Sequence, residues 1–318
     1  GPPRSASHRI EILPAAGTAF RITTIDGEVA DRDFELEWAP AAALLPQASL
    51  RHERFRDRYY GIFVITPAPA AAKDRLPRET TFVVDTSGSM SGESIDQARA
   101  ALAFGLARLA PEDRFNIIQF NSDHSSLFDE PVPVTASTLA QARRYVARLR
   151  ADGGTEMRGA IRQALSAPLA AGLVGQVVFI TDGAVDAEDE LTALIRDRIG
   201  ARRLYCVGIG SAPNGLFMRK AAELGGGTFT FISRPGEVEH RMAKLFEKLS
   251  QPMSTDLAIR LDGGVLAEPI GMPRDLHSGE PLVVSARFVE LPRSIEVSAR
   301  SGAAGGPRWR IPVDIAAT

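Results

Sequence analysis

The middle of the chain alternates short apolar runs with amphipathic stretches. The apolar runs are rich in Val, Ile and Phe, and their apolar residues are continuous instead of alternating with polar ones. They are TTFVVD (80–85), RFNIIQF (114–120), QVVFITD (176–182), RLYCVGIG (203–210) and TFTFI (228–232). Continuous apolar runs of this length are typical of strands that are covered on both faces of a sheet.

Three stretches between these runs have the spacing of an amphipathic helix, with apolar residues every three or four positions. The three stripes are Ile95, Ala98, Leu102, Leu106 and Leu109; Leu139, Ala142, Val146 and Leu149; and Val238, Met242, Leu245 and Leu249. Strands that alternate with helices predict an α/β fold with a doubly wound, mostly parallel sheet. SSLFDEPVP (125–133) follows the second strand too closely for a helical crossover, so we expect an antiparallel edge strand there.

The two ends of the chain have a different pattern, in which apolar and polar residues alternate with period two. At the N-terminal end this pattern covers HRIEIL, FRITTID and FELEWAP before residue 40, and then residues 48–66. At the C-terminal end it covers residues 256–261, 281–288, 294–300 and 308–313. The alternation predicts antiparallel strands, but neither end holds enough of them to close a sandwich comfortably. We therefore predict that the two ends pair in one β-sandwich, into which the α/β domain is inserted.

The predicted domain organisation has three segments. Residues 1–77 form the first part of the sandwich, residues 78–250 form the α/β domain, and residues 251–318 form the second part of the sandwich. A chain of 318 residues is long enough for two domains. Gly1-Pro2 resembles the scar of tag cleavage, so we expect the natural chain to begin upstream.

Composition narrows the classes of partner. The net charge of -2 gives no reason to expect nucleic acid as a partner. No apolar run approaches the roughly 20 residues that span a bilayer, so we expect no membrane insertion by this segment. The single cysteine, Cys206, lies in an apolar run, where we expect a buried thiol; one cysteine excludes an internal disulfide.

Candidate chemistry appears directly after the first central strand, where Asp85, Ser87 and Ser89 occupy every second position. In an open parallel sheet, ligands bind beyond the carboxyl ends of the strands, where the winding direction reverses. Gly88 allows the loop to fold back so that these oxygen atoms converge on one point. Hydroxyl and carboxylate oxygens are hard ligands, which favour Mg²⁺, or alternatively Ca²⁺ or Mn²⁺, over Zn²⁺.

Two further loops carry matching chemistry. ADGGTEM offers Thr155 just before a helix that we expect to begin near Glu156, and FITDG offers Asp182 at the end of another apolar strand. Each motif is a weak signal alone, but the three in this order predict one metal site. Its ligands are Asp85, Ser87, Ser89, Thr155 and Asp182.

On these motifs, residues 78–250 resemble a von Willebrand factor A domain with a metal-ion-dependent adhesion site. The resemblance implies that the three hydroxyls ligate the cation directly and that the two aspartates complete the site, often through water. LPRETTFVVDTSGSMSG, GGTEM, FITDG and VGIGSAPN resemble most the inter-alpha-trypsin-inhibitor heavy-chain-like branch, including marine proteobacterial sortase-target proteins. That branch implies a bacterial cell-surface or extracellular protein in which a further domain precedes this segment.

The expected function is protein binding without catalysis. A partner would present an Asp or Glu side chain to the cation, and the rim of the site would set specificity. The predicted rim residues are Asp123, His124 and Asp186. Asp186 also belongs to an acidic cluster that is expected to begin a helix, where negative charge suits the helix dipole.

Three alternatives remain open at this point. Asp85 and Asp182 could be N-cap residues of the helices that follow. The chain could be a Mg²⁺-dependent phosphohydrolase-like enzyme, although such chemistry usually needs a second carboxylate two residues after the first, where Ser87 stands. It could also be the docking subunit of an ATP-driven metal-insertion or remodelling complex, since such machines use similar domains.

Overall fold

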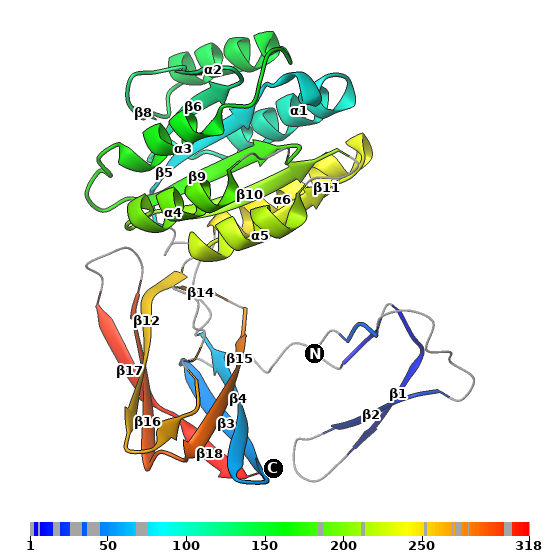
Figure 1. The fold of residues 1–318 in the computed structure, drawn as a ribbon, viewed down its shortest axis with the longest axis vertical. Coiled ribbons are helices and arrows are strands. Elements are labelled where there is room, and N and C mark those ends of the chain that lie inside the picture. The colour runs from blue at the N-terminus through cyan, green and yellow to red at the C-terminus, as the bar shows by residue number, and fades with distance from the viewer. Residues whose placement is uncertain are drawn as a thin grey trace.

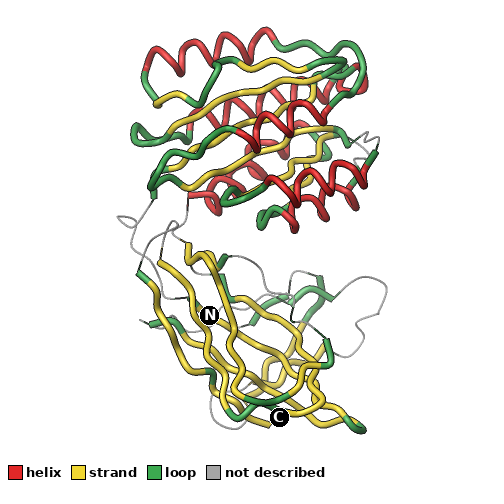
Figure 2. Tube along the Cα trace, turned by 60° about the vertical axis from the view of Figure 1, so that its left-hand side comes forward, coloured by secondary structure: helices red, strands yellow, loops and turns green. Residues whose placement is uncertain are grey.

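The computed structural model describes residues 3–5, 7–14, 20–25, 34–36, 45–67, 76–183, 187–210, 214–250, 253–268, 270, 275–278, 280–301 and 307–317. An α/β domain lies above an all-strand sandwich in Figure 1, and the chain enters and leaves the α/β domain on the side of the sandwich. Figure 2 shows helices on both sides of the upper sheet. Within the described residues, no helix is long and apolar enough to cross a bilayer.

The sheet of the α/β domain is built on the predicted apolar runs. Its parallel strands are β5 (Arg78–Asp85), β6 (Arg114–Phe120), β9 (Val174–Thr181), β10 (Arg203–Ile209) and β11 (Phe229–Ile232). They lie in the order β11-β10-β9-β5-β6, so the winding direction reverses at β5. Every residue of β5, β9 and β10 is buried, which explains why the apolar runs are continuous. Burial raises the pKa of the Cys206 thiol to about 12.

Helices cover both faces of this sheet and form two cores. α1 (Glu93–Ala107), α2 (Ala136–Arg148) and α6 (Val238–Ser250) share one core, to which β5 contributes Phe82 and Val84. α3 (Met157–Ser166), α4 (Glu188–Arg198) and α5 (Gly215–Leu224) share the other core, to which β5 contributes Val83. The doubly wound α/β fold is therefore confirmed. The acidic cluster begins α4 at Glu188, and Asp186 lies outside the described residues.

The predicted edge strand forms as two short strands. β7 (His124–Ser126) and β8 (Val132–Pro133) both pair antiparallel with β6. The side chain of Asn116 separates them, because its Nδ2 donates to the carbonyl of Phe128 at 2.9 Å and its Oδ1 accepts from the amide of Phe128 at 3.1 Å. These side-chain bonds replace the ladder bonds that one continuous strand would make.

The ends of the chain pair in a sandwich, as expected. One sheet has the order β14-β12-β16-β17 and the other has the order β13-β15-β4-β3-β18. The strands are β3 (Gln47–Phe55), β4 (Arg58–Thr66), β12 (Met253–Asp262), β13 (Val265–Leu266), β14 (Leu276–His277), β15 (Leu282–Glu290), β16 (Ser294–Ser301), β17 (Arg308–Pro312) and β18 (Asp314–Ala317). β4 pairs with β15 across the two ends of the chain, and Phe63 and Phe288 are fully buried between the sheets. The domain boundaries at residues 77/78 and 250/251 stay a prediction.

Three details of the strand prediction need correction. β1 (Ile10–Pro14) and β2 (Phe20–Thr24) pair with one another in a separate two-stranded sheet, because their alternation buries too few side chains to join the sandwich. β18 pairs with β3 in parallel, since the buried Val313 leads the chain from β17 in one sheet to β18 in the other. In FELEWAP, residues 34–36 form no strand and residues 37–40 lie outside the described residues.

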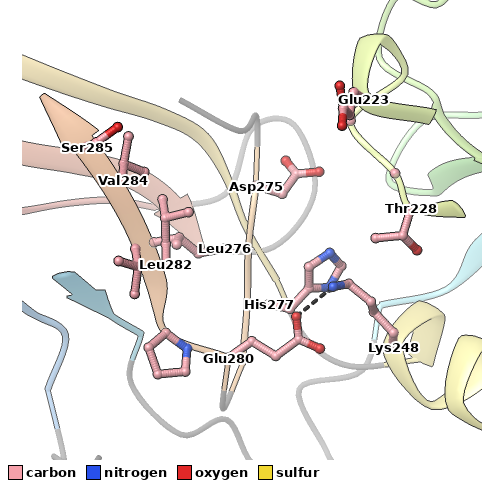
Figure 3. A pocket seen from close by; sticks show the side chains of 14 residues that line it. Glu223, Thr228, Lys248, Asp275, Leu276, His277, Glu280, Leu282, Val284 and Ser285 are labelled. Atoms are coloured by element: carbon pink, nitrogen blue, oxygen red, sulfur yellow. Dashed lines mark hydrogen bonds and ion pairs between the residues drawn. The ribbon is translucent and has the colours of Figure 1, made fainter. Parts of the chain in front are cut away.

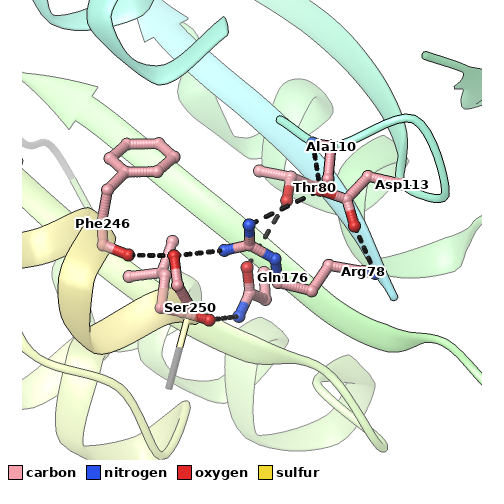
Figure 4. A network of polar contacts seen from close by, with 8 residues as sticks. Arg78, Thr80, Ala110, Asp113, Gln176, Phe246 and Ser250 are labelled. Atoms are coloured by element: carbon pink, nitrogen blue, oxygen red, sulfur yellow. Dashed lines mark hydrogen bonds and ion pairs between the residues drawn. The ribbon is translucent and has the colours of Figure 1, made fainter. Parts of the chain in front are cut away.

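A polar network fixes the start of β5 and the end of α6 (Figure 4). The amide of Arg78 donates to Oδ1 of Asp113 at 2.9 Å, and the two buried side chains form an ion pair at 3.5 Å. Gln176 accepts from the Thr80 hydroxyl at 3.4 Å and donates to the carbonyl of Leu249 at 3.2 Å. Because the last carbonyls of a helix have no partner within it, this bond holds the end of α6 against the sheet.

The sandwich meets the α/β domain at the N-terminal ends of the parallel strands. Arg203, the first residue of β10, donates from Nη2 to Oδ1 of Asp275 at 2.6 Å, and Lys248 of α6 pairs with Glu280 at 2.6 Å. A cleft of about 680 Å³ lies between these contacts (Figure 3), and its lining includes Glu223, Thr228, His277 and Leu282.

Packing between α1 and α6 leaves no room beside Gly105. A Cβ atom at this position would lie 2.8 Å from both Phe82 and Phe246. We expect Gly105→Ala to lower the free energy of unfolding, because overpacking costs about 1–3 kcal/mol and the gain in helix propensity is at most about 1 kcal/mol. Thermal unfolding by circular dichroism measures this. Gly215→Ala on α5 is the control, since its Cβ would be 3.7 Å from Phe229; equal stability of the two variants would contradict the packing argument.

Candidate metal centre

Asp85 ends β5 and its side chain is fully buried. Its Oδ1 accepts from the amide of Ser87 at 2.8 Å, and its Oδ2 accepts from the hydroxyl of Thr181 at 2.6 Å. Thr181 ends the neighbouring strand β9 and in turn accepts from the amide of Gly183 at 3.0 Å. The carboxylate is thus fixed between the ends of two adjacent parallel strands.

The surroundings of Asp85 oppose its negative charge. Burial raises the pKa of this carboxyl, the bonds from Ser87 and Thr181 lower it, and the neighbouring charge of Asp182 raises it again; the net direction is upward. Among the described residues, no basic side chain contributes to this shift. A buried carboxylate is normally paired with a cation or coordinates a metal. Here the two aspartates together would gain from a bound cation.

Two serine hydroxyls lie beside this carboxylate. The Oγ atoms of Ser87 and Ser89 are 3.0 Å apart, because a 3-10 turn over Gly88–Met90 folds the loop back. Ser87 is buried and Ser89 is exposed, so the pair leads from the carboxylate to the surface. Ser87 stands at the N-cap position of this turn, but its side chain makes no capping bond.

The loop that carries Thr155 is tied to this first loop by two backbone bonds. The amide of Gly88 donates to the carbonyl of Gly153 at 3.0 Å, and the amide of Asp152 donates to the carbonyl of Thr86 at 2.8 Å. Thr155 is half-buried and stands two residues before α3, whose N-cap is Glu156. The structure therefore joins two sequence motifs that lie about 70 residues apart.

Asp182 follows directly after β9, so it is next to Thr181 and lies close enough to Asp85 to act on its pKa. Its side chain is half-buried. All five predicted ligands thus stand at the carboxyl ends of the strands or in loops bonded to them. Their assignment as ligands stays a prediction.

Two of the three predicted rim residues follow the carboxyl end of β6, and their role at the rim stays a prediction. Asp123 is exposed in the loop after β6, and His124 begins β7; its Nδ1 lies 3.4 Å from Oδ1 of Asp123. The imidazole packs on Gly159 of α3, where a Cβ atom would lie 2.6 Å from the ring. Asp186, the third rim residue, lies outside the described residues.

The donor set fits a hard divalent cation. Within the described residues there is no group of three or more His, Cys, Asp or Glu side chains that could hold a metal. The five predicted residues offer three hydroxyls and two carboxylates, so a cation there would meet oxygen atoms only, which suits Mg²⁺, Ca²⁺ or Mn²⁺.

The capping alternative is wrong for both aspartates. Glycine and alanine occupy the N-cap positions of the helices that follow, with Gly92 before α1 and Ala187 before α4. Two buried threonines beside the proposed ligands, Thr86 and Thr181, were not predicted from the sequence. Thr86 is buried, and its hydroxyl and amide both donate to the carbonyl of Phe120, at 2.9 Å and 2.8 Å. The threonine that begins TDG, directly before Asp182, was the available signal for Thr181.

Comparisons with known proteins give the family that the central part of the chain matches. The protein-family model of the von Willebrand factor type A domain matches residues 78–231. A von Willebrand factor A domain-containing protein of Dictyostelium discoideum is 28% identical over 288 residues, which cover 86% of this chain and 31% of that relative. Inter-alpha-trypsin inhibitor heavy chain H4 of Homo sapiens is 27% identical over 242 residues, which cover 72% of this chain and 26% of that relative.

Solved structures share the fold beyond the central domain. Von Willebrand factor type A from Catenulispora acidiphila has a TM-score of 0.65 at 17% identity, and covers 88% of this chain and 75% of its own. The ArnB paralog VWA2 from Sulfolobus acidocaldarius has a TM-score of 0.56 at 16% identity, and covers 86% of this chain and 76% of its own. The chain spans about a third or less of the curated relatives it matches. Residues 78–231 of this chain form a von Willebrand factor type A domain.

Proposed function

We propose that this chain is a metal-dependent protein-binding module without catalytic activity. Its residues would hold one divalent cation, with Mg²⁺ as the first candidate, and the cation would supply positive charge for an acidic side chain of a partner. The proposed ligands are Asp85, Ser87, Ser89, Thr155 and Asp182. The observation that carries the proposal is the fully buried carboxylate of Asp85 beside two serine hydroxyls 3.0 Å apart.

The residues of the chain supply what such a module requires. The three hydroxyl ligands are neutral, so they offset none of the charge of a cation, and fewer charged ligands leave the cation a stronger acceptor for an acidic side chain. Ser89 is exposed and marks the side from which a partner would approach. The backbone bonds between the loops hold the donors together before any partner binds, which lowers the entropy cost of assembling the site.

The name of one relative supports a protein-binding role. One relative is a heavy chain of inter-alpha-trypsin inhibitor, which by its name is part of a protein that inhibits another protein. We extend this to a bacterial cell-surface or secreted protein, as the motifs of the sortase-target branch imply. Asp123, His124 and Asp186 remain the proposed contacts that would select among acidic partners.

A peptide selection tests this function. Random displayed peptides selected on the immobilised 318-residue chain in Mg²⁺ should converge on sequences with an essential Asp or Glu. Replacing that acid by its amide should weaken binding at least about tenfold, the equivalent of 1.4 kcal/mol. EDTA or Asp182→Asn should abolish it, and Ser137→Ala, an exposed change on α2, should leave it unaltered. Peptides that bind equally well in EDTA would move the interface away from this site.

A further inference from the structure

The loop after β6 holds no proposed metal ligand, yet it accepts hydrogen bonds from the backbone amides on both sides of Thr155. The Oγ of Ser122 accepts from the amide of Gly154 at 2.8 Å. The carbonyl of Asn121 accepts from the amide of Glu156 at 2.6 Å. We name residues 121–123 the bracing loop, because the threonine between these two amides has its backbone held from both neighbours.

The bracing loop and the Thr155 loop are also packed closely. Gly153 has a φ of +78°, and a Cβ atom there would lie 2.7 Å from the Oγ of Ser122. This close approach brings the serine hydroxyl within bonding distance of the next amide. Gly153 also accepts, through its carbonyl, the bond from the amide of Gly88. The serine side chain therefore contacts the same short segment that joins the two loops of the proposed metal site.

The bracing loop is itself anchored at both ends. At its start, the carbonyl of Phe120 accepts two bonds from Thr86 in the first loop of the site. At its end, the amide of His124 donates to Oδ1 of Asp123 at 2.7 Å, and the imidazole packs on Gly159 of α3. The loop can therefore act as a fixed support, and Asp123 and His124 take part in holding it.

We propose that Ser122 is a positioning residue that sets the place of the Thr155 hydroxyl in the metal site; this rests on the proposed function. Asn121 acts through its main chain, so Ser122 provides the tie that a side-chain substitution can remove. Without it, the Gly154 amide would bond to water, and this glycine-rich segment would sample more conformations. The cation would then have to order Thr155 as it binds.

Isothermal titration of Mg²⁺ into the whole chain, together with melting temperatures in EDTA, tests the proposal. Loss of one hydrogen bond of this kind predicts about five- to tenfold weaker Mg²⁺ binding by Ser122→Ala. Ser122 is exposed, so the melting temperature in EDTA should stay at the wild-type value. Ser122→Thr keeps the hydroxyl and should bind as wild type does, and so should the surface control Ser137→Ala.

The outcomes separate this proposal from the one on which it rests. Ser122→Ala could bind Mg²⁺ with the same affinity as wild type, while Asp182→Asn does not bind it. This result would support the metal site and overturn the role of Ser122. A lower melting temperature in EDTA with unchanged Mg²⁺ affinity would make Ser122 an ordinary stabilising residue and also overturn it. A wild-type chain that binds no Mg²⁺ would overturn both proposals.

Discussion

Asp85→Asn should abolish the response of the chain to Mg²⁺. At a Mg²⁺ concentration about 100 times the dissociation constant, binding to the folded state alone adds about 2.7 kcal/mol, which raises the melting temperature of a chain of this size by about 4 °C. The variant should show no such rise, because it lacks the buried carboxylate at the centre of the donor set. Differential scanning fluorimetry in Mg²⁺ and in EDTA measures both.

The same variant should be at least as stable as wild type in EDTA. Burial opposes the charge of Asp85, so replacing it by a neutral amide removes an unfavourable interaction. The amide oxygen can still accept from Ser87, and the amide nitrogen can donate to Thr181, whose hydroxyl also accepts bonds. Asp197→Asn, an exposed change on α4, is the control and should keep the Mg²⁺ response.

The difference in stability between Asp85→Asn and wild type in EDTA should grow as pH rises. The pKa of Asp85 is raised in the folded state, so the unfolded chain loses this proton at lower pH than the folded chain does. Ionisation therefore destabilises the folded wild type as pH rises from near the ordinary value of 3.8 through the folded pKa. In EDTA, the advantage of Asp85→Asn should be absent at lower pH and present at pH 7. A variant that is less stable than wild type at pH 7 in EDTA would show that the carboxylate is stabilised without metal.

The parallel sheet and the position of the proposed site at its carboxyl edge could be predicted from the sequence. Both follow from the local pattern of apolar residues and from which residues end each strand. The continuous runs around Val83 and Val178 required strands covered on both faces, and parallel strands bring Asp85 and Asp182 to one edge. The two ends of the chain could be paired because each alternates with period two. These features depend on periodicity and topology, which a single sequence carries.

The features that were missed depend on contacts between distant residues. Ser122 stands in a polar loop like any other, and its partner Gly154 is 32 positions away. β18 pairs in parallel with β3 only because the chain changes sheets at Val313, which no alternation reveals. Arg203 and Asp275, separated by 72 positions, are both charged and would be read as surface residues.

Breaking the Arg203–Asp275 ion pair should have a large effect on the free energy of unfolding, because its side chains are only 7% and 2% exposed. Arg203 donates to both carboxylate oxygens of Asp275 and also, from Nη1, to the carbonyl of Ala201 at 2.8 Å. Burial alone would lower the pKa of Arg203, but its bond to Asp275 and the charge of Asp275 outweigh burial and raise this pKa. The pair lies where the sandwich meets β10.

Asp275→Asn should lower the free energy of unfolding by about 3–5 kcal/mol, since it leaves the guanidinium of Arg203 charged and buried without its partner. Asp314→Asn is the matched control: it breaks the Arg51–Asp314 pair, which has a similar 2.8 Å separation but is 46% and 68% exposed. An exposed pair contributes about 0–1 kcal/mol, so this variant should unfold almost as wild type does. Calorimetry compares the three proteins.

The double variant Arg203→Met with Asp275→Leu should recover much of the stability lost by Asp275→Asn, because replacing both buried charges by apolar side chains is often neutral. The pair stands at the N-terminal ends of the parallel strands, and the proposed metal ligands stand at their C-terminal ends. Mg²⁺ should therefore raise the melting temperature of Asp275→Asn as much as that of wild type. If Asp275→Asn cost no more stability than Asp314→Asn, the pair would not hold the sandwich to the domain. If it also removed the Mg²⁺ response, the two ends of the sheet would be coupled.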